Sequence, residues 1–310
     1  MLNSYKKGGI MSKIKQFAAL LPVPSHAKDV ISPPYDVIDA PGARAFAKDN
    51  PRSFLHITRS EIDMPEDVFP YDDSVYENAL SNLNLFQEKG LLVRDASSLY
   101  IYRQVMGEHS QTGVVALASV DEYVNGKIKR HELTREEKVV DRMRHADFIS
   151  AHAEPVFLVH RRNDKVSRLV SQETAEKPLY DLIGWDGVRH IFWRVKEAGG
   201  VLEAFEGFDA LYIADGHHRS ESAARVRELK RGRNPGHIGT EGYNYFPVVI
   251  FSEDEVRIFE YKWDGDPPKR PLSKYSMADV MKLADEGGIM PPKSTWFAPK
   301  LSSGLFMHTF

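Results

Sequence analysis

The sequence predicts an α/β fold in which helices flank a mixed β-sheet. The chain has 310 residues, of which 42% are hydrophobic and 27% charged, proportions typical of a globular protein. Apolar runs of strand length alternate with helix-like patterns along most of the chain. One such run, residues 208–215, passes through Gly216 into a helix-like stretch rich in alanine. Strands and helices interleaved in this way favour an α/β arrangement.

The individual elements follow from hydrophobic periodicity and from the residues that start and stop helices. Thr134 and Glu137, for example, have the spacing of a capping box, and Asn125-Gly126 is a strong turn signal. Helices are expected at residues 41–48, 71–89, 134–149, 164–174, 217–233 and 277–285. Strands are expected at residues 53–58, 98–105, 112–123, 155–160, 179–183, 188–195, 208–215, 245–251 and 256–261, with the last two paired.

Changes in composition along the chain suggest its domain organisation. Residues 1–10 are polar and are interpreted as a disordered leader, and residues 11–261 as the main α/β domain. A split of this domain into two subdomains near residues 125–150 is an alternative. Residues 262–274 are rich in Pro and Lys and are interpreted as a linker or join, and residues 275–310 as a segment that packs on the main domain.

Charge, cysteine content and hydropathy exclude several classes of protein. The net charge of −3 provides no field to attract nucleic acid or an anionic membrane. The absence of Cys excludes disulfides, thiolate zinc sites and cysteine nucleophiles, and it suits a reducing cytosol. No apolar run is long enough to span a bilayer. We therefore expect a cytoplasmic protein whose partners are neither membranes nor nucleic acids.

The run Asp215-Gly216-His217-His218-Arg219 concentrates the most chemistry in the chain. A strand that turns through glycine into a helix leaves amide groups unpaired at the positive end of the helix dipole, which favours anion binding. Asp215 could serve as N-cap, metal ligand or general base. The alternative is that Asp215 and Gly216 form only a cap and turn, with the histidines satisfied locally.

Two further segments carry candidate site residues. Pro33 and Pro34 fix an extended backbone that presents Asp36 from a stiff loop. His131 and Glu132 stand just before a predicted helix, which also contains Arg142. For the charges inside that helix, a solvated face is the simpler interpretation. We expect both segments to approach the Asp215–Arg219 turn, which should lie at the carboxyl end of a central strand.

Several of these motifs resemble one prokaryotic family, labelled domain of unknown function 1015. The resemblance covers most of the chain from about Phe17 onward, and its name implies no activity. Family members carry a longer segment where this chain has the short join at 262–274. The motifs that carry the resemblance are Ser32-Pro33-Pro34-Tyr35-Asp36-Val37-Ile38, Asn50-Pro51, His131-Glu132 with Thr134, Asp141-Arg142, Ala214 to Arg219 and Met290-Pro291-Pro292-Lys293-Ser294-Thr295.

A weaker resemblance suggests an activity. The run from Asp215 to Arg219, followed by Ala223, is similar to the phosphate-holding box of the ParB/sulfiredoxin superfamily, which includes free-serine kinases. The resemblance implies that the amides after Gly216 cradle phosphate, that Arg219 pairs with phosphate oxygens, and that His217 or His218 donates to the transferring group.

The combined prediction is a nucleotide-dependent phosphotransferase acting on a small hydroxyl compound. It would use ATP or ADP, with CTP as an alternative, together with Mg²⁺ bound to Asp215. Glu132 or Asp36 would accept the hydroxyl proton, with His217 and His218 as further catalytic candidates. The expected nucleotide-binding residues are Asp215, Gly216, His217, His218, Arg219, His131 and Arg142.

Two other functions remain open at this stage. A regulatory module could bind nucleotide at the same cradle without transfer chemistry. A metal-dependent hydrolase could be built from imidazole and carboxylate ligands, which suit several divalent ions. Its ligands would be His131, Glu132, Asp215 and His217.

Overall fold

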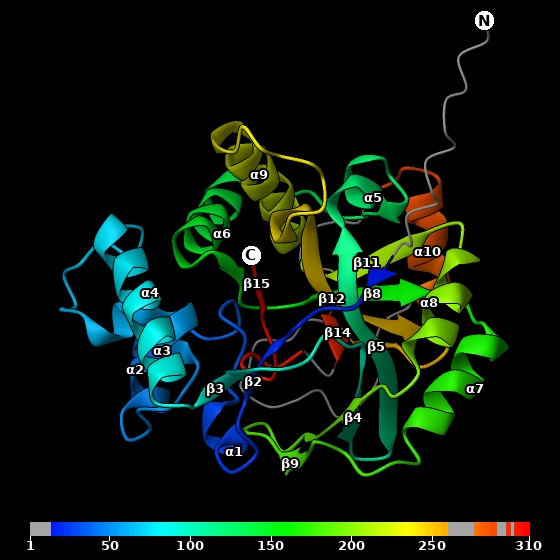
Figure 1. Cartoon of the computed structure of the whole chain (residues 1–310), viewed down its shortest axis with the longest axis horizontal. Coiled ribbons are helices and arrows are strands. Elements are labelled where there is room, and N and C mark those ends of the chain that lie inside the picture. The colour runs from blue at the N-terminus through cyan, green and yellow to red at the C-terminus, as the bar shows by residue number, and fades with distance from the viewer. Residues whose placement is uncertain (1–13, 260–275, 290–295, 299–300) are drawn as a thin grey trace, which may run out of the picture.

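A nine-stranded mixed sheet dominates the computed structural model, which describes residues 14–259, 276–289, 296–298 and 301–310 (Figure 1). The pairs β6–β11 and β8–β12 are parallel, whereas the other pairs described in this sheet are antiparallel. This arrangement confirms the predicted mixed α/β fold. The strand order is β6 (Ile128–Lys129), β11 (Leu211–Asp215), β8 (Val156–His160), β12 (Tyr245–Ser252), β5 (His109–Ser119), β4 (Tyr100–Met106), β10 (Arg189–Arg194) and β9 (Tyr180–Ile183), with β1 (Ile14–Lys15) paired to β5.

Both faces of the central strands are buried, which explains why their sequences read as continuous apolar runs. Alternate residues of β5 point to opposite faces, so that Val115 and Leu117 join one core cluster while Val114 and Ala116 join the other. We call the face that carries Val115 and Leu117 the first face and the one that carries Val114 and Ala116 the second face. Several helices pack their apolar sides on the second face. These helices are α5 (Val120–Val124), α7 (Asp164–Glu173), α8 (Ala198–Glu206) and α9 (His217–Arg233).

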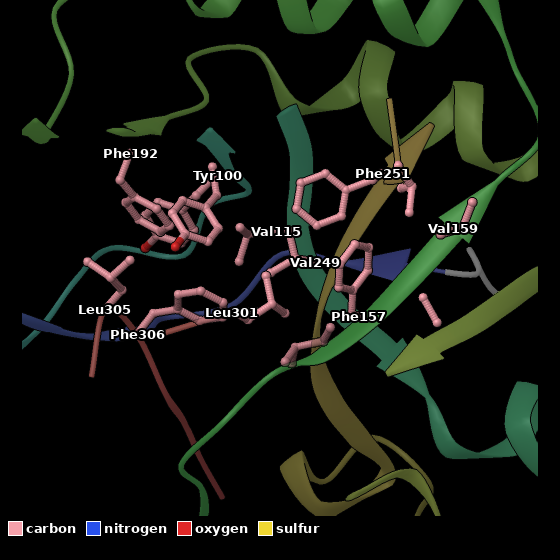
Figure 2. Close-up of a cluster of buried hydrophobic side chains, with 14 of the residues drawn as sticks. Tyr100, Val115, Phe157, Val159, Phe192, Val249, Phe251, Leu301, Leu305 and Phe306 are labelled. Carbon is pink, nitrogen blue, oxygen red and sulfur yellow. The ribbon is translucent and has the colours of Figure 1, made fainter. Parts of the chain in front are cut away.

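The first face of the sheet is covered by chain that lies far from it in sequence. Figure 2 shows Leu301, Leu305 and Phe306 lying against the aromatic and aliphatic side chains of the central strands. Helix α10 (Met277–Asp285) joins the same cluster, and its Asp285 accepts a hydrogen bond from the Tyr212 hydroxyl. The described part of residues 275–310 therefore packs on the sheet.

Short strand pairs fasten the termini of the described chain. These are β2 (Leu20–Pro22) with β3 (Leu92–Arg94), β7 (Ala151–His152) with β15 (His308–Thr309), and β13 (Arg257–Phe259) with β14 (Trp296–Ala298). Ser32 and Ser303 also exchange backbone hydrogen bonds. The contact between Ser32 and Ser303 joins the loop around Pro33 and Pro34, which we call the N-terminal proline loop, to residues 301–310, the C-terminal segment.

A smaller group of helices lies beside the sheet, at the left of Figure 1. It contains α2 (Ala40–Ala47), α3 (Leu55–Thr58), the 3₁₀ turn η1 (Ser60–Asp63) and α4 (Asp73–Glu88), whereas α1 (Ala27–Val30) lies beside β9. Helix α6 (Glu136–Ile149) contacts α4 on one side and α9 on the other. Helix α6 therefore connects the small helices to the strand–turn–helix segment of the sheet; a second 3₁₀ turn, η2 (Gly242–Asn244), follows α9.

Most predicted elements are present, but five expectations about them are wrong. Residues 120–123, expected to end a strand, belong to helix α5, because Ser119 ends β5 and caps the helix by accepting the Asp121 amide. Residues 53–58 contain helix α3 and no strand, because the Phe54 amide bonds to Val30 O and the segment packs among helices. The strands at 245–252 and 257–259 do not pair with each other: β12 already has β5 and β8 as neighbours, and β13 pairs with β14.

The other two errors concern the predicted site. Helix α6 begins without the expected capping box, because the Arg135 amide at its N-cap donates to His218 across the fold. Strand β11 is not central but lies next to the short edge strand β6. The expectations for residues 1–10, 262–274 and 290–295 fall outside the described residues. No helix in the described ranges combines the length and the apolarity that crossing a bilayer requires.

Truncation of Phe306 tests whether the C-terminal segment is part of the core. Phe306 is 3% exposed and stacks on Phe192 with ring centroids 5.6 Å apart. Phe306→Ala should lower the free energy of unfolding by about 3 kcal/mol or more through lost burial and a new cavity. Phe69→Ala, at a ring that is 64% exposed, should change it by about 0.5 kcal/mol or less. Equal urea midpoints for the two variants would contradict this packing.

Candidate functional site

The strand–turn–helix segment has the geometry that the sequence predicts. Strand β11 ends at Asp215, Gly216 has φ +98°, and α9 begins at His217. A Cβ atom at Gly216 would lie 3.1 Å from Nε and 3.2 Å from Cζ of Arg219. Glycine is therefore required here for its positive φ and for the close approach of the guanidinium. Since glycine has no side chain, it cannot itself cap the first amides of α9.

Arg219 is buried, and its guanidinium contacts two groups of the protein itself. Its Nη2 lies 2.8 Å from Asp215 Oδ2, and its Nη1 donates to the carbonyl of Pro155. Burial opposes the charged guanidinium, but Asp215, together with Asp36 and Glu154, outweighs burial and raises the pKa of Arg219. Arg219 thereby holds the turn, and its predicted contact with phosphate stays a prediction.

His131, Glu132 and His217 meet on one side of the turn, as the sequence predicts. The rings of His131 and His217 lie edge to face with centroids 4.6 Å apart. His217 Nε2 accepts the backbone N–H of His131 at 3.4 Å, and His217 Nδ1 lies 3.6 Å from Glu132 Oε2. Burial lowers the pKa of His131 to about 4 and that of His217 well below its usual value. Both imidazoles are therefore neutral near pH 7.

His218 faces another direction and links the turn to helix α6. Its Nε2 accepts the Arg135 N–H at 3.0 Å, and its side chain is half-buried. Burial lowers the pKa of His218, the Lys138 charge lowers it further, and Asp36 acts in the opposite direction. These charges place the Asp36 loop and the first turns of α6 within electrostatic range of the turn.

A buried polar network continues from the turn to the N-terminal proline loop. Glu154 Oε1 accepts the Tyr35 backbone N–H at 3.0 Å and also a hydrogen bond from the Ser303 hydroxyl. Burial raises the pKa of Glu154. The Arg142 guanidinium lies 4.1 Å from the centroid of the Tyr35 ring and pairs with Asp141 at 2.8 Å. Arg142, like Arg219, is thus neutralised by a neighbouring carboxylate.

A cavity of about 370 Å³ opens beside this network, within the size range of small-molecule sites. We call it the α6 cavity. The carboxylate of Asp36 on its wall is exposed. Lys138, Arg142 and His145 line it from α6, where they are spaced four and then three residues apart on one helix face. The rest of the wall consists of Tyr35, Val37, Ile38, Asp39, Thr58, Arg59, Ser60, Glu61, Pro70, Tyr71, Val75, Tyr76 and Asp141.

The predicted site residues thus fall into two groups. Asp36 and Arg142 line the α6 cavity, whereas His131, Glu132, Asp215, Gly216 and His217 form the turn behind it. A smaller cavity of about 30 Å³, lined in part by Arg142, Glu154 and Arg219, lies between the two groups.

Sequence reasoning missed Glu154 and Lys138. The spacing of Lys138, Arg142 and His145 was a usable signal, but charges at that spacing are more often a solvated face. Glu154 gave no signal, because its partners are distant in sequence.

The described residues contain no cluster of side chains that could form the predicted metal site. Within residues 14–259, 276–289, 296–298 and 301–310, no three His, Asp or Glu side chains gather as metal ligands. Asp215, the predicted Mg²⁺ ligand, is paired with Arg219. Mg²⁺ in nucleotide sites needs only one or two carboxylates besides phosphate, and Asp36 is an exposed carboxylate on the cavity wall.

Comparison with known proteins matches the chain to a family model. The model of a family described as "Protein of unknown function (DUF1015)" matches residues 14–262. No curated protein and no solved structure matches the chain. The similarity to the ParB/sulfiredoxin superfamily therefore stays a prediction from the sequence.

Removal of Arg219 should destabilise the fold before it affects any ligand. Arg219→Ala leaves Asp215 without its partner, and breaking a buried ion pair should cost about 3 kcal/mol. Arg225→Ala, also on α9, removes a more exposed ion pair with Glu136 and should cost ~0.5 kcal/mol. Chemical denaturation compares the two variants. An Arg219→Ala protein as stable as Arg225→Ala would show that the Asp215 pair does not hold the turn.

Buried histidines should make the protein sensitive to mild acid. Burial lowers the pKa values of His131, His145 and His308 to about 4 and that of His152 to about 3. Below about pH 6.5 the unfolded imidazoles bind protons that the folded ones do not. The stability that the four neutral, buried histidines allow is therefore complete above about pH 6.5, and it is lost progressively as the pH falls toward about 4.

The free energy of unfolding, measured between about pH 7 and about pH 5, should fall by up to ~1.4 kcal/mol per pH unit for each such histidine. In His145→Gln the free energy of unfolding should depend less steeply on pH, by the contribution of one histidine. An unchanged slope would mean that His145 titrates normally in the folded protein.

Proposed function

This chain belongs to the DUF1015 family, whose description assigns no activity, and we propose that it is a nucleotide-dependent phosphotransferase acting on a small hydroxyl compound. The proposal rests on the α6 cavity, where cations and the exposed Asp36 carboxylate come together, and on the charge of its Lys138, which acts on His218 in the first turn of α9. Phosphoryl transfer depends on positioning and charge neutralisation more than on covalent chemistry, so these groups suit it.

The phosphates would lie between Lys138 and the first turn of α9. Lys138 lines the cavity, and its charge acts on His218 in that first turn. Helix α9 is 17 residues long and begins at Gly216 without a side-chain cap, so its first amides and dipole favour an anion. His218 and these amides would contact the transferring group. Arg219 would act indirectly by holding the turn.

Asp36 would accept the proton of the substrate hydroxyl. Its carboxylate is exposed on the cavity wall, whereas Glu132 does not line the cavity and lies 3.6 Å from His217 Nδ1. We therefore assign the general base to Asp36 and give Glu132 the role of orienting His217. When bound, Mg²⁺ would neutralise phosphate charge, and the nucleotide oxygens would be its principal ligands.

A nucleotide-binding regulatory module is the second candidate. Arg142 and Arg219 are both paired with carboxylates. A bound phosphate would therefore meet less positive charge than phosphoryl transfer is expected to need. This function needs the same cavity but not the Asp36 base.

Nucleotide titration of the whole protein with Mg²⁺ tests the shared part of both functions. Lys138→Ala should weaken ATP binding by about tenfold to hundredfold through loss of a charge-assisted contact. Lys127→Ala, at an exposed lysine paired with Glu122, serves as the matched control and should bind normally. No ATP binding by the unaltered protein, or equal binding by both variants, would contradict the assigned phosphate site.

Turnover separates the two candidates. Incubation with ATP and a panel of amino acids and other small hydroxyl compounds should give a phosphorylated product. Asp36→Asn should retain ATP binding but lower the transfer rate by about 100-fold or more, as expected for loss of a general base. ATP binding without product from any compound would favour the regulatory module.

A further inference from the structure

We infer that the loop before α4 carries a platform for a nucleobase, formed by Phe69 and Tyr71. The inference rests on the proposed function. It concerns how the protein would bind the base of the nucleotide, which contacts to the phosphates leave open. It is carried by two exposed aromatic side chains in contact with each other, of which Tyr71 lines the α6 cavity.

Phe69 and Tyr71 are two exposed aromatic side chains that contact each other. Phe69 is 64% exposed and Tyr71 38% exposed. Their ring centroids lie 5.4 Å apart at an interplanar angle of 87°. Each exposed ring leaves apolar surface in water, and clustered apolar surface commonly marks a binding site. A planar ligand would stack on the exposed part of the Phe69 and Tyr71 rings.

The loop holds these rings in place. The Asp72 amide donates to Phe69 O at 2.9 Å, and Asp72 caps helix α4 by accepting the Ser74 amide at 2.9 Å. Arg144 of α6 donates to Tyr71 O and pairs with Asp73. The Arg144 contact fixes the loop against the helix that also supplies Lys138. The rings are therefore presented by an anchored turn, which reduces the entropy lost on binding.

The same cavity supplies contacts for both ends of a nucleotide. Pro70 and Tyr71 belong to its wall together with Lys138, whereas Arg59 on the same wall is paired with Glu61 at 2.8 Å. A planar ring joined to phosphates satisfies aromatic and cationic groups at once, whereas inorganic polyphosphate uses only the cations. Aromatic side chains stack on any base, because every base has a π face. The platform should therefore accept purines and pyrimidines alike.

Paired titrations with ATP and inorganic tripolyphosphate test the platform. Phe69→Ala and Tyr71→Ala should each weaken ATP binding by about tenfold and leave tripolyphosphate binding unchanged. Ile238→Ala, at an aliphatic side chain that is 79% exposed elsewhere on the surface, should alter neither. CTP should show the same losses as ATP.

The outcomes separate the platform from the phosphate site. If the unaltered protein binds tripolyphosphate as tightly as ATP, or if both aromatic variants bind ATP normally, the platform is overturned while the phosphate site stands. If neither ATP nor tripolyphosphate binds, the proposed function fails and the platform with it. Weakened binding of both ligands in Phe69→Ala would point to a misplaced loop and would also overturn the stacking assignment.

Discussion

The ion pair between Arg219 and Asp215 is the interaction on which the candidate site depends. The guanidinium lies over Gly216 and reaches the carbonyl of Pro155, so that it joins the end of β11, the start of α9 and the chain entering β8. Glu154, next to Pro155, in turn holds the backbone of Tyr35. The buried cation is therefore one of the groups that position the Asp36 loop, together with Arg142 and Ser303. Because such a cation is costly to leave unpaired, this arrangement resists rearrangement.

Helix α6 connects this turn to the cavity. At its N-cap the Arg135 amide donates to His218, and one turn later Lys138 reaches the cavity wall. Farther along, Arg142 lies over the Tyr35 ring. A single rigid helix thus sets the spacing between the start of α9 and the N-terminal loop. Sites carried on regular elements hold their geometry more closely than sites carried on loops.

The parts of the fold that local chemistry determines could be predicted from sequence. Gly216 between an apolar run and an alanine-rich stretch was sufficient to predict the strand–turn–helix segment. Partners distant in sequence could not be predicted: β13 pairs with β14, and residues 53–58 become helical among other helices. The ion pair of Arg219 was not anticipated although Asp215 is four residues away, because a cation near a helix start suits an external anion as well as a local carboxylate. For Glu154, the contacts with Tyr35 and Ser303 arise only in the folded chain.

The contact between Ser303 and the proline loop has a consequence for biosynthesis. Ser303 exchanges backbone hydrogen bonds with Ser32 and donates its hydroxyl to Glu154. A ribosome makes Ser32 and Glu154 long before Ser303 emerges, and chains begin to fold during synthesis. Until then the loop that carries Asp36 lacks one of its supports. The nascent chain can form its first strands and helices early, but we expect this site to mature only after translation of the C-terminal segment.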